Sequence, residues 1–169
     1  ETSLIDINKH TSEYALSKLV SEANLRQQYE RGFNSVTILR FGIIYGSRKN
    51  NWSAVESIFN TVKNNDEVTV GSLKNGRRFI HVSDISDGII RAIGLKGFNV
   101  INLSGEEIIT MHDIIETSQK ILGKTVKIIE NNASTINIRN PSNNKAKTLL
   151  NWKPKILFSE GLKSLKDYL

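Results

Sequence analysis

The chain has 169 residues and carries 23 Lys and Arg against 17 Asp and Glu, so its formal net charge is +6. A chain of this length buries about 70 % of its unfolded surface, which suffices for one core. The absence of cysteine excludes a disulfide scaffold and a thiolate metal site, and no apolar run approaches the roughly 18 residues of a membrane-spanning helix.

The first predicted elements are a helix and a strand. Ser12 is expected to cap a helix that runs to about Arg31, where Gly32 takes the left-handed C-terminal position. Residues 35–41 are rich in β-branched and apolar residues at both odd and even positions, which is typical of a strand covered on both faces. Residues 42–51 then form the loop at its C-terminal end, where open α/β sheets bind ligands.

The middle of the chain begins with a capping box. Ser53 and Glu56 open a helix to about Asn64, with an apolar inner face made of Val55, Ile58, Phe59 and Val62. Residues 67–71 and 77–82 are expected to be two short strands of a hairpin, and residues 74–76 are the turn between them. Ser83 is then expected to cap a helix to about Ile93.

Strand and helix alternate in the last third. Residues 98–103 and 125–129 are predicted strands, and a helix between them is capped by Thr110 and Asp113 and ends at Gly123. The asparagine-rich stretch 130–144 has no clear period and is expected to be a loop. Short helices are predicted at 145–150 and from Ser159 onward.

The basic excess favours an anionic partner. Nucleic acid is disfavoured, because the positive residues are spread along the chain without the aromatic interleaving of a single-strand platform. A diphosphate ligand explains a few arginines gathered at one site better than nucleic acid does. Most lysines are expected to lie on a solvated surface. The lack of cysteine and of a signal-peptide pattern leads us to expect a cytoplasmic protein, with no membrane partner.

Tyr14 and Lys18 form the most informative pair in the sequence, because the i,i+4 spacing places both side chains on one helix face. A free tyrosine, with a pKa of about 10, accepts protons poorly at neutral pH unless a neighbouring cation favours the phenolate. The pair could therefore make a base. Taken alone, this spacing is more common in an ordinary surface pair in which the lysine stem lies along the ring.

Three further blocks follow this helix in order: Leu39-Arg40-Phe41-Gly42-Ile43-Ile44-Tyr45-Gly46-Ser47-Arg48, Arg77-Arg78-Phe79-Ile80-His81-Val82-Ser83-Asp84, and Leu150-Asn151-Trp152-Lys153-Pro154. Together with Tyr-x-x-x-Lys, the blocks resemble the extended short-chain dehydrogenase/reductases, specifically the NAD-dependent nucleotide-sugar epimerases and dehydratases. The resemblance covers nearly the whole chain. It implies an α/β fold: the C-terminal part of a Rossmann-like parallel sheet plus a small mixed α/β substrate-binding lobe.

The family's Gly-x-x-Gly-x-x-Gly phosphate loop is absent from this sequence. We therefore expect the C-terminal portion of a longer protein, preceded by on the order of 120 residues that bind most of the cofactor, NAD or alternatively NADP. Residues 1–50 would end the Rossmann-like domain, and residues 51–169 would form mainly the substrate lobe, with some segments returning to the sheet. The isolated chain is expected to be inactive.

The resemblance implies roles for the matching residues. Tyr14 would be the base that removes a proton from a sugar hydroxyl while the carbon beneath gives hydride to NAD, producing a keto-sugar, as in UDP-glucose 4-epimerases. Lys18 would hold the cofactor ribose and the base, so that Tyr14 and Lys18 both contact the cofactor. Phe41, Gly42 and Ile43 would place backbone groups against it, with Gly42 allowing close approach.

Three arginines are the expected substrate contacts. Arg77 matches the arginine that grips the nucleotide diphosphate, Arg139 is a second candidate, and Arg48 ends the Tyr-Gly-Ser-Arg block. Arg78 stands where the family is often acidic, and either strengthens diphosphate attraction or pairs with Asp84. His81 is expected to be a packed histidine bonded to nearby backbone.

The whole protein would bind a nucleotide-diphosphate sugar and no metal, since Asp84, Asp87 and Glu106 lack metal-ligand spacing and the sequence has no histidine cluster. A homodimer through the Tyr14 helix is a further implication. A 4,6-dehydratase, a reductase or a decarboxylase of the same family remains an alternative to the epimerase. A non-catalytic binding or regulatory protein on this fold is the alternative from another class.

Overall fold

The computed structural model describes residues 12–50 and 52–169. The helices are α1 (Glu13–Glu30), α2 (Ala54–Asn64), α3 (Val82–Ala92), α4 (Met111–Leu122), α5 (Asn144–Leu150) and α6 (Phe158–Lys163). The strands are β1 (Ser35–Phe41), β2 (Ile43–Tyr45), β3 (Glu67–Val70), β4 (Gly76–Arg77), β5 (Phe79–His81), β6 (Gly97–Leu103), β7 (Ile109–Thr110), β8 (Lys127–Glu130) and β9 (Ile138–Arg139). Residues 1–11 of the predicted segment 1–50, and residue 51, lie outside the described part.

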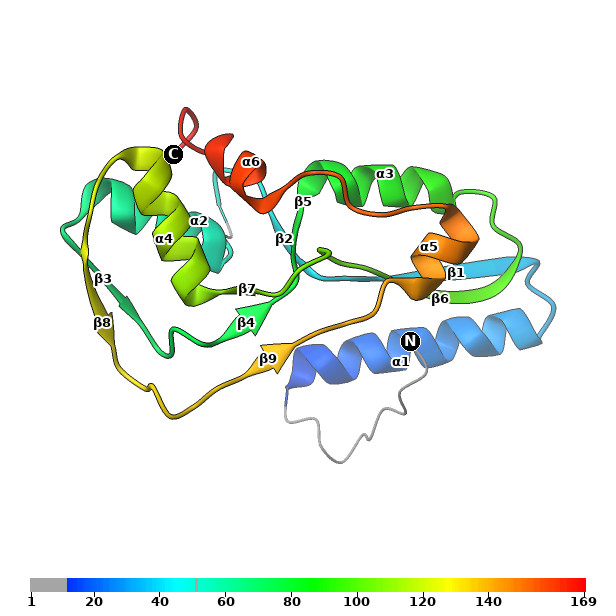
Figure 1. The fold of residues 1–169 in the computed structure, drawn as a ribbon. Coiled ribbons are helices and arrows are strands. Elements are labelled where there is room, and N and C mark those ends of the chain that lie inside the picture. The colour runs from blue at the N-terminus through cyan, green and yellow to red at the C-terminus, as the bar shows by residue number, and fades with distance from the viewer. Residues whose placement is uncertain (1–11, 51) are drawn as a thin grey trace.

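One end of the molecule is built on the parallel pair β1 and β6, which runs in register from Ser35 beside Gly97 to Phe41 beside Leu103 (Figure 1). The chain continues past β1 into β2, which pairs in parallel with β5. Gly42 lies between β1 and β2, and its amide donates to the carbonyl of Leu103 at 2.8 Å. The C-terminal ends of β1 and β6 therefore lie together, as in the parallel sheet that the sequence predicts.

The other end of the molecule carries β3 paired in parallel with β8, and a small mixed sheet in the order β7-β4-β9. The predicted hairpin of residues 67–71 with 77–82 is wrong. The turn at Asn75 instead contacts the start of α4 and the residue before β9. The carbonyl of Asn75 accepts from the amide of Met111 at 3.0 Å, and its side chain accepts from the amide of Asn137 at 2.7 Å.

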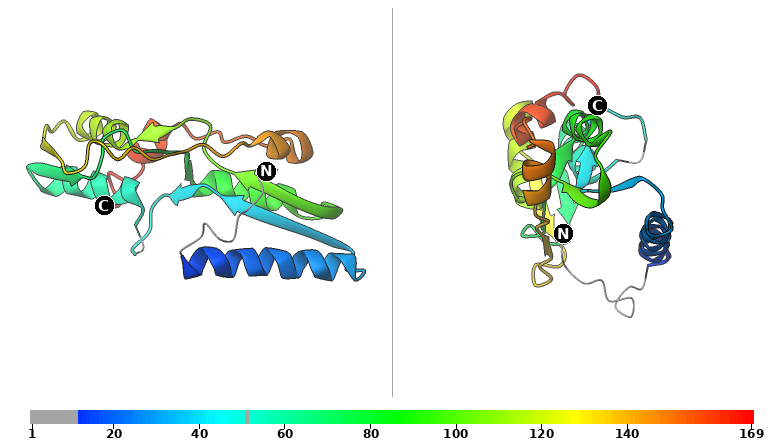
Figure 2. Two further views of the ribbon diagram at one scale, coloured as in Figure 1. Left: turned by 90° about the horizontal axis from the view of Figure 1, so that it is seen from below. Right: turned by 90° about the vertical axis from the view of Figure 1, so that its right-hand side faces the viewer.

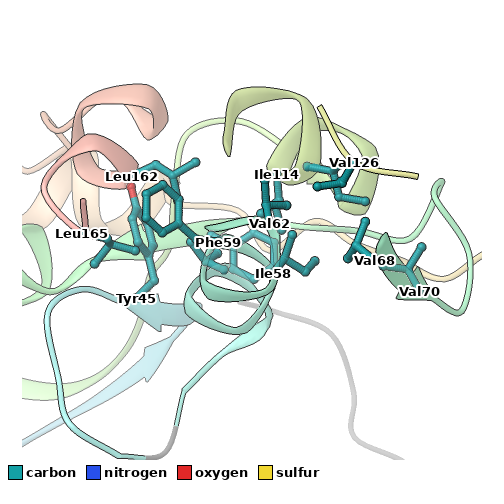
Figure 3. Packing of buried hydrophobic residues seen from close by; sticks show 13 residues of the cluster. Tyr45, Ile58, Phe59, Val62, Val68, Val70, Ile114, Val126, Leu162 and Leu165 are labelled. Carbon is teal, nitrogen blue, oxygen red and sulfur yellow. The ribbon is translucent and has the colours of Figure 1, made fainter. Parts of the chain in front are cut away.

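Two hydrophobic clusters hold the chain together. The first joins α2, α4, α6, β3 and the residues near β8, and Phe59, Ile114 and Leu162 are fully buried in it (Figure 3). The second joins α3, β5, β6 and α5 around Trp152 and Ile101. Because the second cluster takes residues from well beyond position 50, the sheet that β1 begins is completed by later segments. A domain division at residue 50 itself stays a prediction.

Helix α1 stands apart from the rest of the molecule along one side of β1 (Figure 2). None of its described residues is buried. It is attached by polar and aromatic contacts: Arg40 makes an ion pair with Glu22, and Tyr29 packs against Phe98 with ring centroids 5.6 Å apart. No helix in the described part, α1 included, combines the length and apolar character needed to cross a membrane.

The capped helices agree with the sequence. Ser53 with Glu56 and Thr110 with Asp113 both form complete capping boxes, and Gly123 ends α4 with a φ of 63°. Four local expectations are wrong. Ser12 stands at the N-terminal end of α1, but its side chain makes no capping hydrogen bond. Strands β2 and β9 lie inside predicted loops, and α3 is capped by His81 rather than Ser83, because His81 Nδ1 accepts from the amide of Ser83 at 3.3 Å.

Candidate functional site

Tyr14 and Lys18 lie side by side on the exposed face of α1. The Lys18 Nζ atom is 5.3 Å from the centre of the Tyr14 ring, and the Tyr14 side chain is 70 % exposed. The helix thus presents a phenol and an ammonium together on an open surface. The arrangement leaves the phenol free to meet a ligand or another part of the protein.

The segment that follows β1 exposes two apolar side chains on either side of a glycine. Phe41 is 46 % exposed and Ile43 is 39 % exposed. A Cβ atom on Gly42 would lie 2.7 Å from the carbonyl oxygen of Arg78 and 2.9 Å from the Cβ of Ser104. The close approach that Gly42 permits is therefore to the chain itself, and its approach to a cofactor stays a prediction.

Arg77 and Arg139 lie opposite each other on the parallel strands β4 and β9. Arg77 Nη1 donates to the carbonyls of Gly76 and Asn137, which fixes its inner edge. Partial burial, and then the charge of Arg139, lower the pKa of Arg77. The structure thus brings together two of the three arginines that the sequence suggests for substrate binding.

Arg48 lies on the loop after β2 and is engaged by its own protein. Its Nε atom is 3.0 Å from the Oε1 atom of Glu56, and its Nη2 atom donates to the carbonyl of Ile44 at 3.2 Å. The side chain is still 35 % exposed. Within the described residues no hydrogen bond or ion pair connects Arg48 with Tyr14 or with the Arg77 and Arg139 pair.

Glu56 is the residue at this site that the sequence does not reveal. Its capping-box spacing predicts a surface helix terminus, whereas the side chain is fully buried and reaches the Arg48 loop. No local pattern signals that contact.

Arg78 and Asp84 do not pair, so that alternative is wrong. Arg78 Nη1 donates to the carbonyl of Gly105 at 3.4 Å. Both oxygens of Asp84 accept from backbone amides, those of Lys155 at 3.0 Å and Ile156 at 3.1 Å. Asp84 therefore anchors the segment before α6 and is not available to Arg78.

His81 is packed and bonded to backbone, as the sequence predicts. Its ring meets the Tyr45 ring edge-on with centroids 5.4 Å apart. Burial lowers the pKa of His81, and the charge of Asp84 partly opposes that shift. Burial also raises the pKa of Tyr45. These two groups are thus neutral under ordinary conditions.

A cavity of about 270 Å³ lies between the Asp84-anchored segment and the loop after β6. Its lining includes Tyr45, His81, Glu106, Glu107 and residues 153–158, and none of the sequence-predicted site residues. On α4, the side chains of His112, Asp113 and Glu116 lie within 4.8 Å of one another. Asp113 already accepts from the Thr110 amide at 2.8 Å, as a cap does.

Comparisons with known proteins agree on one family. A profile of the NAD dependent epimerase/dehydratase family matches residues 1–103. The UDP-glucuronate 4-epimerase of Thermodesulfobacterium geofontis is 26 % identical over 94 % of this chain and 50 % of its own length. UDP-glucuronic acid decarboxylase 1 of Arabidopsis thaliana is 29 % identical over 96 % of this chain and 36 % of its own length.

Solved structures show the same fold. The UDP-glucuronic acid 4-epimerase of Bacillus cereus, in complex with UDP-glucuronic acid and NAD, superposes with a TM-score of 0.79 at 24 % identity. The UDP-glucose 4-epimerase of Thermus thermophilus, in complex with NAD, gives 0.81 at 21 % identity. These matches cover 99 % of this chain and 56 % and 58 % of the respective structures. The chain spans about half the length of the relatives it matches.

Proposed function

Because the chain belongs to the NAD dependent epimerase/dehydratase family, whose profile covers residues 1–103, we propose that the whole protein is an NAD-dependent nucleotide-sugar epimerase. The observation that carries the proposal is the pairing of Tyr14 with Lys18 on an exposed helix face. A phenol and an ammonium in that position suit proton transfer at a sugar hydroxyl. The relatives named above make a UDP-sugar the best-supported substrate class.

Tyr14 would accept the proton of the sugar hydroxyl, and Lys18 would favour the phenolate by its charge and hydrogen-bond the cofactor ribose. When bound, NAD supplies the acceptor for the hydride that leaves the sugar carbon. Phe41, Gly42 and Ile43 would border the cofactor from the end of β1. The exposed phenol and ammonium fit the ribose end of NAD, whereas the sequence offers no glycine-rich loop for its pyrophosphate.

The diphosphate would bind to Arg77 and Arg139. Two guanidinium groups on neighbouring strands repel each other, and a doubly charged anion between them relieves that repulsion while accepting paired hydrogen bonds. Arg48 would add a third positive group from the loop after β2. The substrate would then lie between the sheet end and the lobe formed by β4, β7 and β9.

A UDP-glucuronic acid decarboxylase is the second candidate, because several relatives of similar identity carry that name. Epimerase and decarboxylase activities start from the same oxidation and differ in what the keto-sugar does next. A homodimer through α1 is a further part of the proposal. It is supported by the exposed apolar side chains of Val20 and Leu25 on that helix.

The test is a Tyr14→Phe variant of the full-length protein, assayed with UDP-glucuronic acid, UDP-glucose and NAD. Removal of the hydroxyl should lower turnover about 10²–10⁴-fold while UDP binding stays nearly unchanged. Tyr29→Phe is the matched control, since Tyr29 lies on the same helix and packs against Phe98. It should retain turnover.

The products decide between the candidates. A 4-epimer identifies an epimerase, and release of CO₂ with a pentose identifies a decarboxylase. Full activity of Tyr14→Phe would refute the base assignment. UDP-sugar binding without turnover in the unmodified full-length protein would instead support a non-catalytic binding protein. The isolated 169-residue chain should bind no NAD and show no turnover.

A further inference from the structure

The carboxylate of Glu56 makes contacts in two directions. Its Oε2 atom accepts from the amide of Ser53 at 2.9 Å and from the Ser53 hydroxyl, which completes the capping box of α2. Its Oε1 atom accepts from the amide of Gly46 at 3.1 Å and lies 3.0 Å from Arg48 Nε. The side chain is fully buried, so these partners compensate the removal of its charge from water.

Helix capping alone does not require the second set of contacts. On α4 the equivalent carboxylate, that of Asp113, uses its Oδ2 atom for the Thr110 amide and hydroxyl. No hydrogen bond or ion pair from Asp113 reaches a candidate site residue within residues 12–50 and 52–169. The described part of the chain thus contains two capping boxes with Ser or Thr at the cap, of which one also holds the Arg48 loop.

The Arg48 loop is constrained at several points besides Glu56. Gly46 has a φ of 152°, and a Cβ atom there would lie 2.7 Å from Val82 Cγ1, so only glycine fits. The indole of Trp52 donates to the carbonyl of Arg48 at 2.9 Å. Arg48 also donates to the carbonyl of Ile44. The inner edge of the guanidinium is therefore fixed, while its 35 % exposure leaves the rest of the group accessible.

We propose that Glu56 is a positioning residue for substrate binding, which holds Arg48 and the Gly46 turn in the orientation that meets the anionic substrate. The proposal rests on the proposed function, in which Arg48 contacts the nucleotide-sugar. Ordering a free arginine on binding lowers affinity, and Glu56 removes that penalty by ordering Arg48 in advance. Its effect should appear in binding and not in the chemical step.

The first test is Glu56→Gln in the full-length protein, with Asp113→Asn as the matched control. Glutamine has the same shape and keeps an acceptor for the capping amide, but it loses the charge that attracts Arg48. Glu56→Gln should raise KM for the UDP-sugar, and the Kd for UDP, roughly three- to tenfold with little change in kcat. Asp113→Asn should lower thermal stability by weakening its capping contacts with Thr110, and it should leave both KM and Kd unchanged.

A double-mutant cycle separates positioning from a general structural effect. In an Arg48→Ala background, Glu56→Gln should raise KM no further, because the group that it positions is gone. An unchanged KM for Glu56→Gln in the wild-type background would overturn the proposal, and so would a full additional rise in the Arg48→Ala background.

An NMR readout distinguishes this proposal from the proposed function. The side-chain Nε–H group of Arg48 should be rigid on the picosecond-to-nanosecond timescale in the unmodified protein and mobile in Glu56→Gln, as measured by its heteronuclear NOE, whether or not substrate is present. If the full-length protein fails to bind any UDP-sugar, the proposed function is wrong and substrate positioning by Glu56 is overturned with it. If it binds UDP-sugar but the Arg48 Nε–H group is equally mobile in both proteins, only the Glu56 proposal is refuted.

Discussion

Asp84 provides the sharpest test of how the C-terminal segment is held. The residue is 4 % exposed and lies near the start of α3, where its two oxygens accept from the amides of Lys155 and Ile156. The indole of Trp152 donates to the Asp84 carbonyl at 3.2 Å. One residue thus ties α3 to the segment that leads into α6.

Replacement of Asp84 by asparagine keeps the size of the side chain but removes the charge and one acceptor. Each hydrogen bond to a charged group contributes about 1.5–3 kcal/mol, so the pair contributes about 3–6 kcal/mol. Asparagine retains one neutral bond, worth about 1 kcal/mol, and turns its NH₂ group toward the other amide. The free energy of unfolding should therefore fall by about 2–5 kcal/mol.

Urea unfolding followed by tryptophan fluorescence measures this change, because Trp152 is buried beside Asp84. Asp87→Asn is the matched control on the same helix. Asp87 is partly exposed and pairs with Arg91 at 2.9 Å, so its replacement should lower stability by no more than about 0.5 kcal/mol. Equal effects of the two substitutions would show that the amide contacts of Asp84 do not hold the segment.

Two further predictions concern the region between the clusters. Gly42→Ala should lower the free energy of unfolding by about 1–3 kcal/mol, because the new Cβ would lie 2.7 Å from the Arg78 carbonyl oxygen. A melting temperature equal to that of the wild-type protein would contradict this prediction. The lowered pKa of His81 means that the unfolded chain takes up the proton first as pH falls below about 6.5, so stability should decrease there. His81→Asn keeps a helix-capping acceptor and should flatten that part of the pH profile of urea unfolding; an unaltered profile would assign the dependence to other groups.

Local signals carried most of the correct sequence predictions. The capping boxes at Ser53 and Thr110 and the left-handed glycine at position 123 are determined by neighbours within four residues, and all three are present. Strand pairing depends on partners far along the chain. β3 pairs with β8 and not with β4, the strand after the nearest turn, because β4 pairs with β7 and β9.

The candidate site shows the same division. The neighbourhood of Tyr14 and Lys18 follows from a four-residue spacing, and the structure confirms that they share a face. The register of Arg77 with Arg139 depends on the pairing of β4 with β9, and β9 lies inside the predicted loop of residues 130–144. The contacts of Glu56 with Gly46 and Arg48 depend on how the loop after β2 folds back over α2. No periodic pattern in the sequence predicts that fold.

The two hydrophobic clusters also bear on how the chain folds during synthesis. The cluster around Phe59 is completed by Leu162 and Leu165, and the cluster around Ile101 is completed by Leu150 and Trp152. Neither cluster can close until the chain has left the ribosome at least as far as Trp152. Earlier in synthesis β1 lacks β6 and β3 lacks β8, because these partners lie about 60 residues downstream. Until both clusters close, their apolar side chains stay exposed, and such exposure favours aggregation of the nascent chain.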